Sequence, residues 1–269
     1  MIFLKQKIKN IFLQTNSLSV LDKINYAYSK LKHSAANKKF KKLNPNFTFP
    51  PDYYLYETYK LDYRQYKKDG EITAKEILEW TTKYIYDEQL KILEWGCGVA
   101  RIIRHIPNLV DNAAIFGTDI NQKMTDWNSN NIDRVIFSAI EYYPPTHFNN
   151  DQFNLIFAIS VFTHIEVKLQ SDWLTEINRI IADNGVFLFT TQGKKYETNL
   201  NEKQKDELDM RGALTINYKQ KGHRMMSSYN KHKNLKILVE KYFEVLEYYD
   251  GLDYPDKIGG QDLWIVRKK

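Results

Sequence analysis

Short apolar runs alternate with amphipathic segments over most of this chain. Five runs have the length and composition of buried parallel strands, at residues 92–95, 113–119, 134–138, 154–160 and 186–190. Helical spacing of apolar positions marks other segments, at residues 72–86, 99–106, 173–181 and 235–242, and Asn184-Gly185 is expected to end the third of these helices. Two more strand-like runs follow, at residues 243–249 and 262–267. Strands that alternate with helices in this way predict a doubly wound α/β fold with parallel pairing and right-handed crossovers.

A glycine turn, Gly96-Cys97-Gly98, follows the first of these strands. A strand, a glycine turn and a helix in succession form the nucleoside- or phosphate-binding corner of an open parallel sheet. The strict dinucleotide fingerprint has a third glycine where this chain has Arg101, which disfavours NAD and FAD. The pattern favours a nucleoside without a pyrophosphate, such as S-adenosylmethionine. A chance Gly-x-Gly in an ordinary strand-to-helix turn is the alternative.

An acidic residue, Asp119, ends the second predicted strand. It lies about 20 residues after the glycine turn, where nucleoside-binding α/β folds place a carboxylate for the ribose hydroxyls. A carboxylate suits this role because it accepts hydrogen bonds from two neighbouring hydroxyls. The alternative role is an N-cap for a helix that starts near Gln122. Together, the turn, the strand and the acid favour the ligand-binding role.

The first part of the chain differs in composition from the rest. Residues 1–69 are predicted to form a helical extension rich in tyrosine and lysine, and residues 70–269 to form the nucleoside-binding domain. Within residues 1–14 the apolar positions suit an amphipathic helix that lies on a membrane surface or packs on protein. A basic cluster at residues 38–42 indicates a solvated face or a phosphate contact. The tyrosines of residues 53–66 could stack on sugar or base rings, or cap the core.

A polar segment, residues 192–230, interrupts the alternation of strands and helices. An insertion of this length after a core strand is usually functional or disordered, and we expect a substrate cover that includes a helix at residues 201–210.

Composition narrows the possible functions only modestly. The chain has 269 residues and a single cysteine, which excludes a disulfide framework and a cysteine-based zinc site. Its net charge of +6 favours anionic partners, although genome composition explains it equally. No apolar run near the start of the chain is long enough to span a bilayer, so we expect a cytoplasmic protein, or one peripheral to the membrane.

Several motifs together resemble the class I S-adenosylmethionine-dependent methyltransferases. These are the glycine-turn motif at residues 92–98 with Arg101, the acid Asp119, the fourth-strand motif at residues 153–165 and the block at residues 180–185. The likeness runs from about residue 71 to residue 269, interrupted by the insertion. The resemblance implies a Rossmann-like, mostly parallel seven-stranded sheet whose antiparallel last strand is residues 262–267. It implies S-adenosyl-L-methionine as the cofactor, with no metal.

The resemblance also implies a set of cofactor-binding residues. They are Glu94, Gly96, Cys97, Gly98, Arg101, Asp119, Ile120, Ala139, Ile140, Ile159 and Ser160. Two positions depart from the family pattern. Ala100 only partly supplies the third small residue of the glycine turn, and residues 138–141 offer no acid or amide where the adenine amino group is commonly held, except Glu141. Cys97 itself is expected to be a small packing residue in the cofactor loop.

The candidate catalytic residue is His164, which follows the fourth strand. Histidine can accept a proton near neutral pH, so it suits an alcohol acceptor, although it could instead only shape the loop. Glu166, His223 and Asp262 are reserve candidates. Runs at residues 160–164 and 259–267 resemble methyltransferases of surface-polysaccharide synthesis, so we expect a small-molecule or glycan acceptor. RNA or protein methylation, and a non-enzymatic nucleoside-binding module, are the alternatives, with nucleic acid disfavoured.

Overall fold

The computed structural model describes residues 18–87, 89–216, 222 and 226–269. The chain divides into two compact units, residues 1–68 and 69–269. The predicted amphipathic segment at residues 1–14 lies outside the described residues. In the part of the chain that the structure describes, no helix combines the length and apolarity needed to cross a bilayer.

The first unit contains α2 (Leu18–Leu43), α3 (Asp52–Thr58) and the beginning of α4 (Tyr63–Thr81). The buried Asn37 joins two of them, because its side chain donates to the Leu61 carbonyl at 3.3 Å and accepts from the Tyr63 amide at 3.0 Å. Aromatic rings fill the space around it: Phe49 stacks on Tyr63 with ring centroids 4.3 Å apart. Tyrosines of this segment therefore pack within their own unit.

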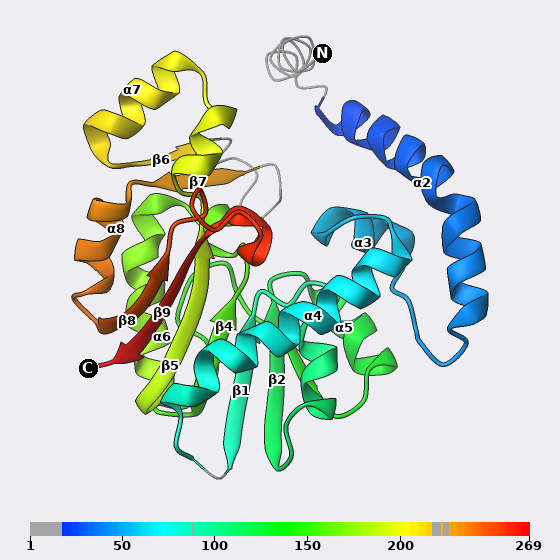
Figure 1. Cartoon of the computed structure of the whole chain (residues 1–269), viewed down its shortest axis with the longest axis horizontal. Helices are drawn as coiled ribbons and strands as arrows, with labels where there is room; N and C mark the ends of the chain where they lie inside the picture. Colours follow the sequence, from blue (N-terminus) through cyan, green and yellow to red (C-terminus); the bar gives the residue numbers. More distant parts are fainter. Residues whose placement is uncertain (1–17, 88, 217–221, 223–225) are drawn as a thin grey trace. The chain divides into compact units, whose positions relative to one another are not determined.

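The second unit is built on a seven-stranded sheet in the order β3-β2-β1-β4-β5-β9-β8. Its strands are β1 (Leu90–Trp95), β2 (Ala113–Asp119), β3 (Ile136–Ala139), β4 (Phe153–Ala158), β5 (Ile181–Thr191), β8 (Phe243–Tyr249) and β9 (Asp262–Lys268). The β1, β2, β3, β4 and β5 pairings are parallel, and β9 runs antiparallel to both β5 and β8. This confirms the predicted Rossmann-like sheet with its antiparallel last strand (Figure 1).

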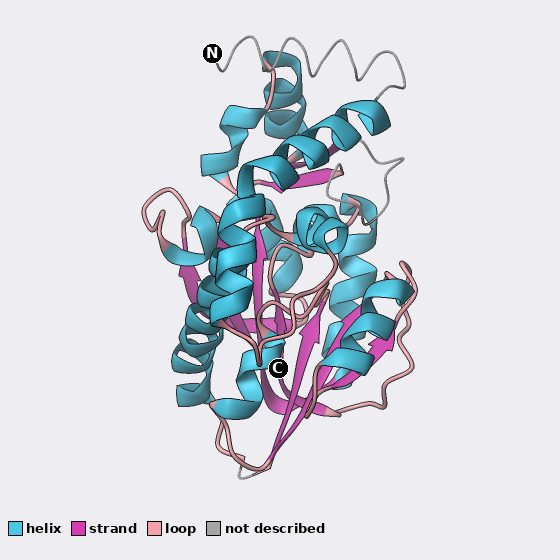
Figure 2. Ribbon diagram, turned by 90° about the vertical axis from the view of Figure 1, so that its right-hand side faces the viewer, coloured by secondary structure: helices cyan, strands magenta, loops and turns pink. Residues whose placement is uncertain are grey.

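Helices cover both faces of this sheet, as Figure 2 shows. Neighbouring strand residues point to opposite faces, so Leu93 belongs to the core cluster that contains Trp173 of α6 (Gln170–Ile180), and Ile92 belongs to the cluster that contains Ile77 of α4. The cluster that contains Leu93 and Trp173 also includes residues of α8 (His232–Val239). Strands buried on both faces explain the nearly unbroken apolar runs in the sequence.

Two local predictions were wrong. The helix expected at residues 99–106 is replaced by turns and a short 3-10 helix, η2 (Ile103–Asn108). Ala100 has a left-handed backbone (φ 55°) that an α-helix does not admit, and Pro107 lacks the amide hydrogen that a longer helix needs. Asn184-Gly185 does not end a helix, because α6 stops at Ile180 and these residues lie in an irregular part of β5.

The insertion forms a small subdomain of its own. It contains η5 (Lys194–Asn199), α7 (Glu202–Arg211) and a two-stranded antiparallel sheet of β6 (Ala213–Ile216) and β7 (Ser227–Asn230). The helix was expected, whereas the two short strands were not. A bridge between Gln192 and Tyr229 ties the hairpin to the end of β5, and Figure 1 shows both strands beyond that end of the sheet. The insertion therefore stands at the edge where ligands of such sheets bind.

Candidate active site

The glycine turn uses its own backbone donors internally. The amides of Gly96 and Cys97 both donate to the Thr118 carbonyl at 2.8 Å, and the amide of Gly98 donates to Oδ2 of Asp119 at 2.8 Å. A loop that cradles a pyrophosphate points such amides at the ligand instead. This turn therefore presents a carboxylate, and not a set of unused amides, to a bound molecule.

Ala100 adopts a left-handed backbone directly after the glycine turn. Its φ is 55°, its side chain is fully buried, and its amide donates to the Cys97 carbonyl at 2.8 Å. A left-handed backbone costs an alanine about 1–2 kcal/mol, which the surrounding packing must offset. The third small residue of the turn is therefore held in a conformation that an alanine adopts only under tertiary constraint.

Gly70 of α4 allows that helix to approach the loop closely. A Cβ atom at Gly70 would lie 2.1 Å from the carbonyl oxygen of Arg101. Only a glycine permits this approach, so α4 and the loop meet backbone to backbone. Gly70 carries no ligand signal in the sequence, because it is a single glycine just before the helix predicted at residues 72–86.

Asp119 is oriented by two backbone donors. Oδ2 accepts from Gly98, and Oδ1 accepts from the Asn121 amide at 2.8 Å. Burial raises the pKa of this carboxyl, and these amides oppose that rise. Each oxygen keeps a second lone pair for a hydroxyl. The N-cap of α5 (Gln122–Asn131) is Asn121, whose side chain accepts from the Met124 amide, so Asp119 does not have the alternative role.

Glu94 and Cys97 face the interior of the protein. Oε2 of Glu94 accepts from the Ile103 amide at 2.9 Å, and burial raises the pKa of Glu94 to about 8. The Cys97 thiol is buried and its pKa is raised well above its usual range, which makes it a packing residue and not a nucleophile. Asn128 of α5, which the sequence analysis did not single out, donates to the Gly98 carbonyl at 2.9 Å.

Residues after β2 and β3 lie beside Asp119. The Ile140 amide donates to the Asp119 carbonyl at 3.0 Å, and Ala139 is the register partner of Asp119. The Ile120 side chain is 40% exposed, and a Cβ atom built on Gly222 would lie 2.2 Å from its Cδ1. The insertion therefore reaches across the edge of the sheet to the residue that follows Asp119.

The chain makes a strained turn after β4. Ser160 has a φ of 62°, and its amide donates to Oγ1 of Thr190 at 2.8 Å. Its hydroxyl lies 3.0 Å from Oε1 of Gln261, which also accepts from Thr190 at 2.6 Å. The ends of β4 and β5 and the beginning of β9 are thus joined by one hydrogen-bond network. Ile159, the residue before Ser160, is half-buried against the α4 side of the core.

His164 ends the 3-10 helix η3 (Phe162–His164), one turn after Ser160. Its Nδ1 lies 2.7 Å from the carbonyl oxygen of Met226, at the start of the hairpin strand β7. A carbonyl only accepts, so Nδ1 carries the proton, and in the neutral ring Nε2 is the basic nitrogen. The backbone of the insertion therefore sets the tautomer of this histidine.

Comparison with known protein families agrees with this geometry. Residues 93–187, from β1 into β5, match the family model described as a methyltransferase domain. This stretch is therefore a methyltransferase domain, and it lies on a sheet with the class I methyltransferase fold. No curated protein matches its sequence.

Solved structures similar to this methyltransferase share its fold at low sequence identity. The PH0226 protein of Pyrococcus horikoshii is 16% identical, with 77% of this chain and 96% of that chain covered and a TM-score of 0.50. A S-adenosylmethionine-dependent methyltransferase of Methanosarcina mazei is 16% identical, with 70% and 95% covered and a TM-score of 0.51. The 1,6-didemethyltoxoflavin N1-methyltransferase of Burkholderia thailandensis, solved with S-adenosylhomocysteine, is 14% identical, with 74% and 78% covered and a TM-score of 0.52.

The residues around the glycine turn fit the methyltransferase cofactor. S-adenosylmethionine has a ribose but no pyrophosphate, and it carries positive charge on its sulfonium and amino groups. The turn offers the Asp119 carboxylate, with Gly96, Cys97 and Gly98 already bonded within the protein. An acidic group without unused amides suits such a ligand better than it suits a dinucleotide.

Two of the three reserve candidates, Glu166 and Asp262, make side-chain contacts within the protein. Oε2 of Glu166 pairs with the Lys168 ammonium at 2.9 Å. The carboxylate of Asp262 accepts from the Tyr248 hydroxyl at 2.8 Å and from the Gly251 amide at 3.0 Å. His223 lies outside the described residues. No group of three metal-ligating side chains occurs among the residues that the structure describes.

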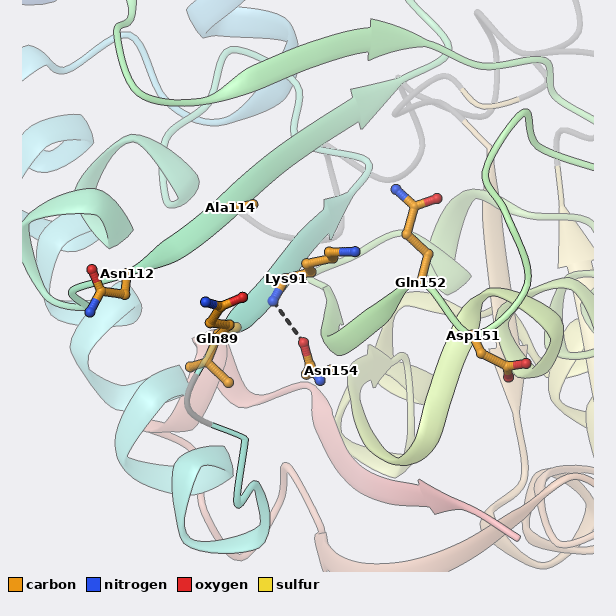
Figure 3. A pocket seen from close by; sticks show the side chains of 8 residues that line it. Gln89, Lys91, Asn112, Ala114, Asp151, Gln152 and Asn154 are labelled. Atoms are coloured by element: carbon orange, nitrogen blue, oxygen red, sulfur yellow. Dashed lines mark hydrogen bonds between the residues drawn. The ribbon is translucent and has the colours of Figure 1, made fainter.

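A polar depression lies at the opposite edge of the sheet, at the amino-terminal ends of β1, β2 and β4 (Figure 3). Its best-defined contact is structural, because Oδ1 of Asn154 accepts from the Lys91 amide at 2.7 Å and its amide nitrogen donates to Asp87. Ligands of open parallel sheets bind at the carboxyl-terminal ends of the strands. We therefore place the active site at the glycine turn and not here.

Proposed function

We propose that this methyltransferase methylates a hydroxyl oxygen of a small molecule or of a sugar in a surface glycan, with His164 as the general base. The observation that carries the proposal is the 2.7 Å contact between Nδ1 of His164 and the Met226 carbonyl. Because Nδ1 carries the proton in this contact, Nε2 is the nitrogen that can accept a proton in the neutral ring. The histidine lies on the loop that follows β4. An alcohol is the acceptor class that gains most from such a base.

The cofactor supplies an activated methyl group on a sulfonium centre. The protein would hold the acceptor oxygen in line with that methyl group. Nε2 of His164 would take the hydroxyl proton as the carbon–oxygen bond forms and the carbon–sulfur bond to the departing S-adenosylhomocysteine breaks. The carbonyl of Met226 stabilises the resulting imidazolium, because it continues to accept from Nδ1. The strained turn at Ser160 holds the start of the loop that carries the histidine.

We assign the cofactor contacts to residues from three strand ends. Asp119 receives the ribose hydroxyls, and Ile120, Ala139 and Ile140 surround the base. Gly96 and Gly98 shape the floor of the site, while Glu94, Cys97 and Arg101 support that floor from behind. Ile159 and Ser160 face the methionine part. Two observations support this assignment. Two backbone amides donate to the Asp119 carboxylate, and the Ile140 amide donates to the Asp119 carbonyl.

The acceptor class rests on the insertion and on the resemblance to polysaccharide-associated methyltransferases. The insertion, residues 192–230, stands at the same edge as the glycine turn and would cover an acceptor there. A cytoplasmic enzyme of this kind would act on a nucleotide-linked or lipid-linked sugar before export. Residues 1–14 are our proposed additional contact to the membrane surface.

Calorimetric titration with S-adenosylhomocysteine, with NAD as the control ligand, tests the cofactor site. Micromolar binding of the first alone supports the assignment. The acceptor is then tested by transfer of a labelled methyl group to a panel of nucleotide sugars, free sugars, RNA and peptides. Labelled sugar supports the proposal, whereas labelled RNA or peptide alone would refute the acceptor class and leave the methyltransferase itself intact.

A further inference from the structure

α2 turns one face toward its own unit and the opposite face toward solvent. The inward face is defined by Tyr26, His33, Asn37 and Phe40, which are buried or half-buried. Tyr26 packs edge-on against Tyr53 of α3, and His33 pairs with Asp62 at 3.5 Å. Within residues 22–68, the part of this unit whose side chains the structure describes, Ile24, Tyr28 and Leu31 on the other side of the helix are exposed.

That opposite face carries a stripe of large apolar side chains. Ile24 is 57% exposed, Tyr28 is 67% exposed and Leu31 is 80% exposed. They are spaced four and three residues apart, so they lie on one side of the helix in successive turns. Ala35 continues the stripe by a further turn. A contiguous apolar stripe in water marks a contact surface more often than single exposed residues do.

Lysines border this stripe on both sides. α2 contains seven lysines and one aspartate, as its printed sequence shows. At 100° per residue, Lys38 falls on one flank of the stripe, and Lys32 and Lys39 fall on the other, and all three are exposed. Long lysine side chains can keep their stems beside apolar material and their ammonium groups at a polar boundary.

We propose that this face of α2 docks on an anionic lipid surface. The apolar stripe would enter the boundary between headgroups and acyl chains, and the flanking lysines would pair with lipid phosphates. Tyr28 suits that boundary, because tyrosine has an apolar ring and a polar tip. The inference concerns a surface outside the methyltransferase site and does not depend on the acceptor.

Charge distinguishes lipid from other partners of this face. A second copy of the chain, docked stripe to stripe, would bring two lysine-bordered surfaces together, and like charges oppose that contact. A nucleic acid would pair with the lysines but would leave the stripe of Ile24 and Leu31 unused. An anionic lipid surface satisfies both parts of the pattern at once.

Vesicle co-sedimentation of the full chain tests the proposal. The probes are vesicles of phosphatidylcholine alone and of phosphatidylcholine with about one-third phosphatidylglycerol, at low and high salt. We expect binding to the anionic vesicles that weakens with salt, and little binding to the neutral ones. Leu31→Gln should lower the partition coefficient about tenfold. Met210→Gln on α7 is the matched control, because Met210 is 78% exposed and lies on the other unit.

A second pair of variants separates charge from apolar contact. The double variant Lys32→Gln/Lys39→Gln should lower binding to anionic vesicles about tenfold. The control is the double variant Lys233→Gln/Lys241→Gln, which removes two exposed lysines from the other unit and should leave binding unchanged. Absence of vesicle binding, or binding that Leu31→Gln leaves unchanged, would overturn the proposal. A Leu31-dependent dimer in light scattering without lipid would assign the face to a second copy instead.

Discussion

The carboxylate of Asp119 accepts a hydrogen bond from the backbone amide of Gly98 at 2.8 Å, so the acid at the end of β2 and the glycine turn after β1 form one unit. The two strands are register partners up to Trp95 and Thr118, which brings their ends together. A change at the acid therefore affects both the proposed ribose contact and the shape of the turn.

Replacing Asp119 by alanine should lower the affinity for S-adenosylhomocysteine by about 100-fold, because two charge-assisted hydrogen bonds to hydroxyls are lost. Titration calorimetry measures the change. Asp119→Asn retains one accepting oxygen and should bind with intermediate affinity. Wild-type affinity in both variants would mean that the ribose is held elsewhere.

The stability of the protein should depend on pH through Glu94. Its folded-state pKa is raised to about 8 by burial, against an ordinary value of 4.5. The folded protein therefore binds the proton more tightly than the unfolded chain does, so the free energy of unfolding falls as pH rises from about 4.5 to 8. Glu94→Gln should flatten this fall and be the more stable form at pH 8.5. Urea denaturation at pH 5.5 and 8.5 compares the two proteins, and parallel pH dependence would contradict the expectation.

Ala100→Val should destabilise the protein by about 2–4 kcal/mol. A β-branched side chain disfavours the left-handed backbone at this position, and the site has no room for two more methyl groups. The control is Ala35→Val on the exposed side of α2, which should cost less than about 1 kcal/mol. Denaturant midpoints give both values, and similar losses would show that the left-handed turn is not rigid.

His164→Gln should lower kcat by about 10²- to 10⁴-fold and leave the affinity for S-adenosylhomocysteine within about twofold. Glutamine can still donate to the Met226 carbonyl, but it cannot accept the proton. Proportional losses of turnover and cofactor affinity would instead point to a structural histidine.

Thr190→Val should reduce stability by about 1–3 kcal/mol and also reduce turnover, because it removes the hydroxyl that holds the Ser160 amide. Thr58→Val at the end of α3 is the control, because its exposed hydroxyl donates to the Tyr54 carbonyl of the same helix. Denaturation and single-turnover rates are compared for the two variants. Equal stability of both would mean that the network after β4 contributes little.

The sequence predicted the sheet because its central strands are buried on both faces and therefore appear as apolar runs. It also placed Asp119 and the glycine turn correctly at adjoining strand ends. It did not reveal the Ser160, Thr190 and Gln261 network, since these ordinary polar residues are distant in the chain and meet only when β9 enters the sheet between β5 and β8. The helix expected after the turn failed because Ala100 adopts a conformation that alanine usually avoids.

The contact between His164 and Met226 joins residues that are 62 positions apart, one in the core fold and one in the insertion. The Ser228 hydroxyl reinforces it by donating to the Ile165 carbonyl at 2.6 Å. A change in the hairpin would therefore move the imidazole that we propose as the base, while the turn from Gly96 to Gly98 would keep its own contacts. In an engineered protein, exchange of the hairpin alone would be the smallest graft that re-aims this histidine.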